Sequence, residues 1–191
     1  MTVAFAFTGS FCTFEKAFAA LREVKSTFGD VIPVFSQTAA STDTRFGRAE
    51  DFLRAAETIC GHAPVTTVAG AEPLGPRDLA QVMVIAPCTG NTLAKLAHGI
   101  NDTAVTMAAK SLLRNGRPIV IGLSTNDGLA VSAGNVGSLL ARRNIYFVPF
   151  RQDDPAGKPR SLTAELTLLP QTLTEAISGR QLQPLLLSAA G

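Results

Sequence analysis

The segment VMVIAPCTGNT (Val82–Thr92) decides the fold class, because it passes from a buried strand to a helix through a rigid polar turn. Val82–Ala86 is apolar throughout, which is typical of a parallel strand covered on both faces. We expect Pro87 to end this strand, while Gly90 allows the backbone to approach a neighbour or a ligand. A helix is expected at about Asn91–His98, so the segment predicts one unit of a strand and helix alternation.

The same alternation extends along the chain in both directions. Further apolar runs of strand length lie at 3–7, 31–35, 119–123 and 145–148, with a weaker run at 65–68. Segments with apolar residues at helical spacing lie between them, at about 13–28, 46–59 and 103–115. We therefore expect an α/β fold, with a doubly wound, mostly parallel, Rossmann-like (flavodoxin-like) sheet and helices on both faces.

The connections between these elements carry expectations of their own. Residues 36–43 should form a polar loop, and residues 70–76, with two prolines and two glycines, an ordered turn rather than a helix. Asp102 suits the N-cap of the helix that follows it. From about residue 150 we expect an exposed, proline-punctuated arm and then a helix at about 170–178. Since no linker divides the sequence, all 191 residues are expected to form a single domain.

Composition restricts the classes of function. Hydrophobic residues make up 46% and charged residues 17% of the chain, so it can bury a full core and is not a disordered tail. The net charge of +2, without a basic block, argues against nucleic-acid binding through a charged patch. No apolar stretch approaches the roughly 20 residues of a membrane-spanning helix. Three cysteines without CxxC spacing fit a reducing compartment, and we expect a cytoplasmic location.

Polar residues follow four of the expected strands, at the edge where α/β sheets bind ligands. They are Gly9 and Ser10, then Ser36 and Thr38, then Thr89, Asn91 and Thr92 after Pro87, and finally Ser124, Thr125 and Asn126. Hydroxyls and glycine beside a helix N-terminus bind phosphate, so the four loops predict a pocket for a neutral, polar, phosphate-bearing ligand. For the first loop alone, a tight turn with a capping hydroxyl explains the residues equally well.

Several of these segments resemble a known family. TGS at 8–10, APCTGNTLAKLAHGIND at 86–102 and the loop around Asn126 resemble the flavoprotein family of cysteine decarboxylases and flavin prenyltransferases, whose members bind FMN. The resemblance implies that Gly9 and Ser10 bind the FMN phosphate, with support from Ser36 and Thr38. It places Pro87, Thr89, Asn91 and Thr92 against the ribityl chain and isoalloxazine ring, and Ser124, Thr125 and Asn126 at the active-site segment.

Further segments resemble, more specifically, the B-subunit family of dipicolinate synthases. They are STDTRFGRAEDF (41–52), AEPLGP (71–76), STNDGL (124–129), NIYFVPFRQDDP (144–155) and TLLPQT (167–172). This resemblance implies a part in dipicolinic acid synthesis during sporulation. The partner, the A subunit of dipicolinate synthase, is then expected to carry NADP and to oxidise a dihydrodipicolinate-type precursor. It also implies a homo-oligomer, either a trimer or a multiple of trimers.

The sequence departs from the decarboxylases at two points. Only Asn126 remains of their PxMN-type segment, and residues 71–80 lack the histidine that precedes the AP loop in that family. Cysteine decarboxylation is therefore not expected. Two alternatives to a synthase subunit stay open, namely an independent FMN-dependent decarboxylase or oxidoreductase, and a non-catalytic scaffold that kept the fold.

Two residue types allow more than one interpretation. A dicarboxylate substrate needs a cation, and the Arg45 guanidinium can bind a carboxylate through two hydrogen bonds. A contact between Arg45 and Asp43, or a helix cap, explains this arginine as well. Cys12 and Cys88 lie next to the ligand loops, where packing of a small side chain competes with a nucleophilic role.

Overall fold

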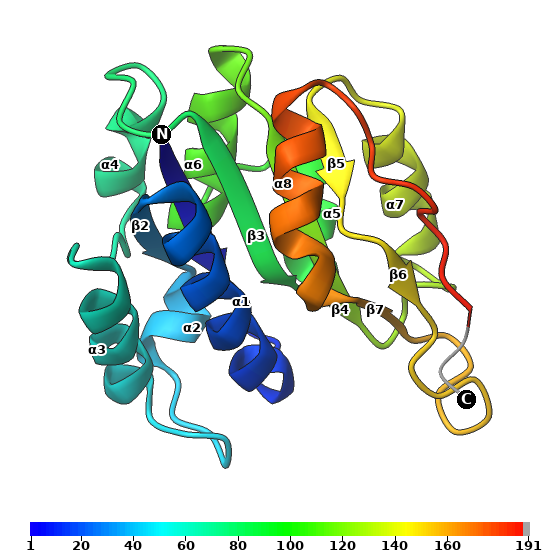
Figure 1. Ribbon diagram of the computed structural model, residues 1–191. Coiled ribbons are helices and arrows are strands. Elements are labelled where there is room, and N and C mark those ends of the chain that lie inside the picture. The colour runs from blue at the N-terminus through cyan, green and yellow to red at the C-terminus, as the bar shows by residue number, and fades with distance from the viewer. Residues whose placement is uncertain (189–191) are drawn as a thin grey trace.

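The computed structural model, which describes residues 1–188, is a mixed seven-stranded sheet enclosed by helices (Figure 1). The strands are β1 (Thr2–Phe7), β2 (Asp30–Phe35), β3 (Val82–Cys88), β4 (Ile119–Thr125), β5 (Ile145–Phe147), β6 (Phe150–Arg151) and β7 (Leu162–Ala164). Five strands lie side by side and run parallel, in the order β2, β1, β3, β4 and β5. Strand β7 pairs with the end of β4 in the antiparallel direction, and β6 pairs antiparallel with β7. The predicted doubly wound, mostly parallel sheet is confirmed.

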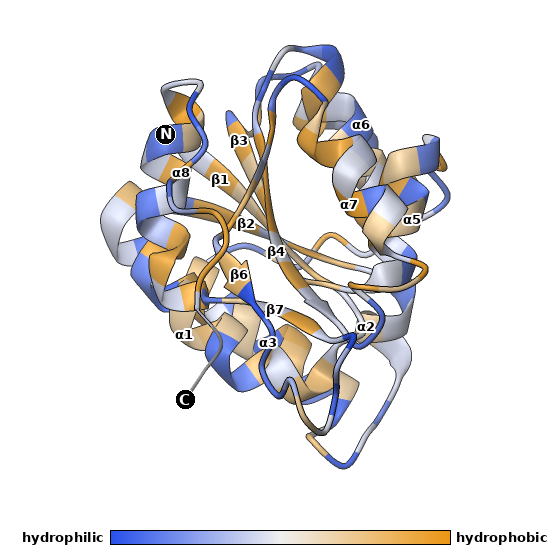
Figure 2. Ribbon diagram, turned by 90° about the vertical axis from the view of Figure 1, so that its right-hand side faces the viewer, coloured by the Kyte–Doolittle hydropathy of each residue, from blue (hydrophilic) through white to orange (hydrophobic). Residues whose placement is uncertain are grey.

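Helices cover both faces of the sheet. They are α1 (Phe14–Phe28), α2 (Gln37–Ser41), α3 (Ala49–Cys60), α4 (Val68–Ala71), α5 (Gly90–His98), α6 (Ala104–Arg114), α7 (Ala133–Leu140) and α8 (Leu169–Ile177). In Figure 2 the helices α1, α3 and α8 lie on one side of the sheet, and α5, α6 and α7 lie on the other. None of the helices within residues 1–188 combines the length and the apolar character that crossing a membrane requires.

A cluster of phenylalanine rings fixes α1 and α3 against β1 and β2. The Phe7 ring stacks on Phe18 and on Phe35, with 4.8 Å between ring centroids in both pairs. The Phe14 ring meets Phe52 edge-on, also at 4.8 Å. Such aromatic pairs add to the stability that burial alone gives. The cluster therefore holds the start of α1, and with it the loop after β1, at a defined place on the sheet.

Pro87 does not end β3, which continues to Cys88, so this prediction was wrong. The pairing of β3 with β4 shifts register between Ile85 and Cys88. A proline has no N–H to contribute to the ladder, and an irregularity of this kind accommodates it within a sheet. The carbonyl of Pro87 is used instead by the hydroxyl of Thr8, as described below.

Short helices replace two of the expected loops. Residues 36–43 contain α2, whose N-cap is Ser36, and residues 70–76 overlap α4 and a 3₁₀ turn at 72–74. In the weak run at 65–68, only Val65 makes a bridge, to Val34, and α4 begins at its end. Helices and bridges of this length show no periodicity in the sequence, so the patterns missed them.

Three further expectations about element ends were wrong. Helix α3 begins at Ala49, so Phe46 lies in the preceding loop and is 46% exposed instead of facing the core. The N-cap of α6 is Thr103, and Asp102 forms an ion pair with Lys95 at 2.8 Å. Residues 150–164 are more than an exposed arm, because β6 and β7 form there and extend the sheet from the end of β4.

Candidate functional site

A cavity of about 990 Å³ lies at the carboxyl ends of β1, β3 and β4. The loops that follow these three strands line it, together with Thr44, Phe46 and residues from the segment between β6 and β7. The cavity thus lies at the edge where sequence reasoning placed the ligand pocket. It is large enough for a cofactor, since ligand pockets commonly measure about 300–1,000 Å³.

Thr8 joins the loops after β1 and β3 beneath this cavity. Its Oγ1 donates a hydrogen bond to the carbonyl oxygen of Pro87 at 2.7 Å and accepts one from the amide of Thr89 at 3.0 Å. The side chain is 1% exposed, so water does not compete for these bonds. Thr8 was not among the residues predicted for the site. The available signal was a hydroxyl residue directly after a fully apolar strand.

Three hydroxyls join the loops after β1 and β4. Ser124 Oγ lies 2.8 Å from both Ser10 Oγ and Thr13 Oγ1. Ser10, Thr13 and Ser124 all line the cavity. Each hydroxyl can donate one hydrogen bond and accept others, so the group can reorient toward a phosphate or a ligand hydroxyl.

The start of α5 forms another part of the lining. Thr89 is the N-cap of α5 and accepts a hydrogen bond from the Thr92 amide at 3.2 Å. The next position is crowded, because a Cβ on Gly90 would lie 2.8 Å from Thr125 Oγ1 and 2.9 Å from Ser132 Oγ and would displace these hydroxyls. The side chain of Asn91 is exposed at the cavity.

Asp127 supplies a fixed negative charge to the same wall. Its Oδ1 accepts hydrogen bonds from Thr125 Oγ1 and, at 2.8 Å, from Ser132 Oγ. The bond from Thr125, aided by the one from Ser132, lowers the pKa of the Asp127 carboxyl below its usual range. The carboxylate is therefore ionised at neutral pH. Asp127 belongs to the STNDGL segment at 124–129 but was not among the residues predicted for the site.

Most of the residues predicted for the ligand site lie together in the cavity. These lining residues are Gly9, Ser10, Thr89, Asn91, Ser124, Thr125 and Asn126. The others support the lining from behind, as Thr92 Oγ1 accepts a hydrogen bond from Thr89 Oγ1 at 3.2 Å. Ser36 accepts one from the Ala39 amide in α2, and the Thr38 methyl group lies beside Gly9. Pro87 contributes its carbonyl to Thr8.

Arg45 lies outside the residues that line the cavity, although both its neighbours, Thr44 and Phe46, belong to them. Its guanidinium carbon lies 4.9 Å from the centre of the Phe46 ring, the geometry of a cation–π contact. Asp43 accepts a hydrogen bond from the Ala49 amide at 2.9 Å and so caps α3. Within the described residues, Arg45 therefore neither pairs with Asp43 nor caps a helix, and the cap of α3 is made by Asp43 alone.

Three charged residues that sequence analysis did not assign to the site also line the cavity: Lys16, Asp153 and Lys158. Lys158 Nζ and Asp153 Oδ2 form an ion pair at 3.3 Å.

Cys12 lines the cavity and is exposed, whereas Cys88 is buried and its burial raises the pKa of its thiol. A buried, protonated thiol is a poor nucleophile, so packing explains Cys88.

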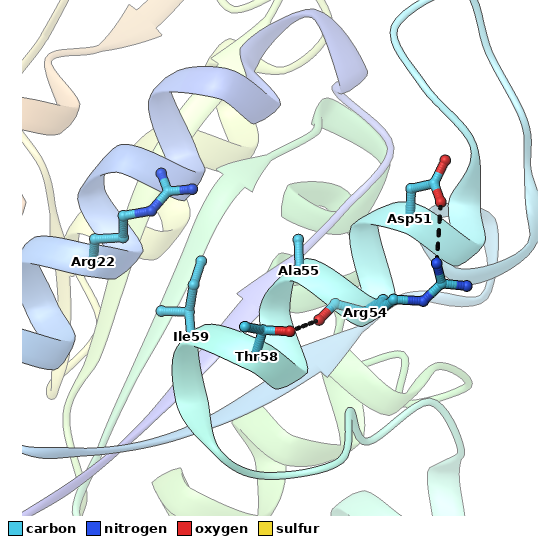
Figure 3. Close-up of a pocket in the computed structure, with 6 residues that line it drawn as sticks. All are labelled: Arg22, Asp51, Arg54, Ala55, Thr58 and Ile59. Carbon is cyan, nitrogen blue, oxygen red and sulfur yellow. Dashed lines mark hydrogen bonds and ion pairs between the residues drawn. The ribbon is translucent and has the colours of Figure 1, made fainter.

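A second hollow, of about 330 Å³, lies between α1 and α3. Figure 3 shows its lining, which consists of Arg22, Asp51, Arg54, Ala55, Thr58 and Ile59. Arg54 points toward Asp51, at 3.9 Å, and Thr58 Oγ1 donates a hydrogen bond to the Arg54 carbonyl oxygen at 2.8 Å. None of the residues predicted for a site lies in this groove.

The fold and the polar cavity at its edge agree with one class of protein. A model of the Flavoprotein family matches residues 1–139, so the chain belongs to the Flavoprotein family. The B subunit of dipicolinate synthase from Bacillus subtilis (strain 168) is 44% identical to this chain over 184 residues, which is 96% of this chain and 92% of that protein. The predicted resemblance to these synthase subunits, and to the family, is confirmed.

Solved structures agree with this placement. The crystal structure of the dipicolinate synthase B subunit from Bacillus halodurans superposes with a TM-score of 0.90 at 40% identity, and the match covers 99% of this chain and 97% of that one. The FMN-dependent cysteine decarboxylase SpaF gives a TM-score of 0.63 at 27% identity, over 92% of this chain and 97% of that one.

Proposed function

We propose that this chain is the B subunit of a dipicolinate synthase and works in the cytoplasm during sporulation. The observation that carries the proposal is the match to the Bacillus subtilis B subunit of this enzyme along nearly the full length of both proteins, at 44% identity. The match is much stronger than the one to the decarboxylase SpaF, at 27% identity. A polar cavity at the sheet edge offers a place where such a protein can bind its substrate.

The proposed reaction is an oxidation that two different subunits share. A dihydrodipicolinate-type precursor loses two hydrogens when its ring becomes aromatic. One leaves as hydride to NADP⁺ on the A subunit, and the other leaves as a proton to solvent. In this chain, the hydroxyls of Thr13 and Ser124, which line the cavity, would bind and orient the substrate.

The lining residues also fit FMN, which we propose as a ligand of the cavity. Gly9 lines the cavity and has no side chain, which leaves room for a phosphate to approach the backbone closely. Phe46, 46% exposed, offers an aromatic face, and Asn91 and Asn126 offer amides that suit the polar edge of a flavin ring. Gly9 and Ser10 would hold the phosphate. When bound, FMN supplies a centre for redox chemistry.

A tryptophan at position 91 tests the FMN site. Asn91→Trp places a large ring where the cavity should hold the flavin, and overpacking of this kind costs about 1–3 kcal/mol, or about 5- to 150-fold in affinity. The measurement is quenching of FMN fluorescence on titration with wild type and variant. Thr58→Trp, in the groove between α1 and α3, is the matched control and should bind FMN as wild type does. Equal FMN affinity in all three proteins would remove FMN from this cavity.

Reconstitution tests the function itself. The purified chain and the A subunit from the same organism are assayed for NADPH and dipicolinate formation, separately and mixed. We expect the mixture to exceed the sum of the separate rates by at least about tenfold, since each protein would supply part of the site. An A subunit that is fully active alone, together with a chain that binds it but changes no rate, would instead support the non-catalytic scaffold. Turnover by this chain alone would support the independent flavin enzyme.

We also propose that the chain forms a homo-oligomer, a trimer or a multiple of trimers. Two structural neighbours are oligomers, namely a dodecameric FMN-dependent UbiX-like decarboxylase from Escherichia coli O157:H7 and the cubic protein cage of Burkholderia xenovorans DmrB. Light scattering on the eluting protein gives the mass directly. A mass of one or two chains at micromolar concentration would exclude this assembly.

A further inference from the structure

Lys16 lines the cavity and, within the described residues, forms no ion pair with a carboxylate. The charged lining residues of the cavity are Lys16, Lys158, Asp127 and Asp153. Asp127 is bound by two hydroxyls, and Asp153 is paired with Lys158 at 3.3 Å. Within residues 1–188, no carboxylate lies within ion-pair distance of Lys16.

The position of Lys16 on α1 directs it to the cavity wall. Lys16 lies in the first turn of α1, directly after the turn at 11–13 that contains Cys12 and Thr13. Both Cys12 and Thr13 line the same cavity. The first turn of a helix disfavours a cation, because the helix dipole is positive there. The dipole of α1 therefore does not stabilise the positive charge of Lys16, whereas an anionic ligand in the cavity would stabilise it.

We infer that Lys16 binds a carboxylate of the dicarboxylate substrate. The inference rests on the proposed function, because dipicolinate and its dihydro precursor each carry two carboxylates. Arg45, the cation that the sequence analysis proposed for this role, lies over the Phe46 ring and outside the lining residues. Lys16 lines the cavity and forms no ion pair with a carboxylate of residues 1–188. It therefore replaces Arg45 as the residue that selects for a second carboxylate.

Binding of dipicolinate to the FMN-saturated complex with the A subunit tests the inference. Calorimetry compares dipicolinate with picolinate, which has a single carboxylate, for wild type, Lys16→Gln and Lys16→Arg. Loss of one charge-assisted hydrogen bond should weaken dipicolinate binding by about 10- to 100-fold in Lys16→Gln. Lys16→Arg, which keeps the charge, should recover most of the affinity. The matched control is Lys110→Gln, at an exposed lysine of α6 outside the cavity, and should bind as wild type does.

The same proteins separate the possible failures. Lys16→Gln that binds dipicolinate like wild type overturns the inference and leaves the proposed function in place. Lys16→Gln that loses FMN affinity, yet binds dipicolinate normally once FMN is saturating, also overturns it, because the lysine would then serve the phosphate. A wild-type complex that neither binds nor forms dipicolinate overturns the proposed function and the inference together. In steady-state assays, a rise in KM with little change in kcat supports a binding role.

Discussion

The two hollows of this molecule differ in how they are built. The cavity at the sheet edge is lined by segments that come from β1, β3, β4 and the β6–β7 connection, which are far apart in the sequence. The groove between α1 and α3 is lined by one residue of α1 and five of α3. In the groove, the charges of Arg54 are already balanced within its own helix, by Glu50 and Asp51.

Long-range hydrogen bonds distinguish the cavity from the groove. The cavity joins loops through hydroxyls whose partners lie more than 75 residues away, as in the contacts of Thr8 with Pro87 and of Ser10 with Ser124. The groove lies between the exposed faces of α1 and α3. The hydroxyl of Thr58 in it donates a hydrogen bond to the carbonyl oxygen of Arg54, one turn earlier in α3. Ligand sites in open α/β sheets lie at the carboxyl ends of the strands, so the fold favours the cavity.

The largest expected effect is in the rate of cysteine labelling. Cys12 is exposed at the cavity, whereas burial raises the pKa of the Cys60 thiol to about 11. Only the thiolate reacts, so iodoacetamide should label Cys12 at least about 100-fold faster than Cys60, as peptide mass spectrometry can measure. FMN should protect Cys12 but not a cysteine placed in the groove by Thr58→Cys. If FMN protected Cys12 and the cysteine of Thr58→Cys equally, or did not protect Cys12 at all, FMN would not bind selectively in the cavity.

A pair of matched threonine substitutions comes next in size. Thr8→Val removes the buried hydroxyl that bonds the amide of Thr89 and the carbonyl of Pro87, which should lower the free energy of unfolding by about 1–3 kcal/mol. Thr58→Val removes an exposed hydroxyl of the groove and should change it by less than about 0.5 kcal/mol. Urea unfolding measures both. A Thr8→Val protein as stable as wild type would show that the loops after β1 and β3 are not joined through this hydroxyl.

The charge of Asp127 should give a smaller, pH-dependent effect. Hydrogen bonds from Thr125 and Ser132 lower the pKa of this carboxyl in the folded state, so its ionisation stabilises the fold above the unfolded pKa of about 3.9. That contribution is lost as pH falls through the lowered folded pKa. Asp127→Asn should therefore cost about 1 kcal/mol at pH 7 and progressively less below pH 4 in urea unfolding. A difference that stays constant between pH 7 and pH 3 would contradict this account.

Features that depend on local sequence could be predicted, whereas features that depend on contacts between distant segments could not. The parallel strands were predictable because burial on both faces leaves apolar runs such as 82–86. Gly9, Asn91 and Asn126 could be assigned to one pocket because each follows a strand, and the ends of parallel strands meet. Lys16 was missed because its place depends on how α1 is rotated on the sheet. Asp153 and Lys158 reach the cavity only because β7 pairs with the end of β4, and a three-residue strand leaves no pattern.

The smallest effect is expected in the groove, where Arg54→Ala removes ion pairs to Glu50 at 2.6 Å and to Asp51 at 3.9 Å. The Arg54 side chain is 65% exposed and that of Glu50 is 62% exposed, so water and salt already screen these charges. The free energy of unfolding should change by less than about 0.5 kcal/mol, and FMN affinity should not change. A loss of affinity for FMN or for the A subunit in this variant would make the groove a functional surface. The protein would then have a second site that does not lie at the carboxyl ends of the strands.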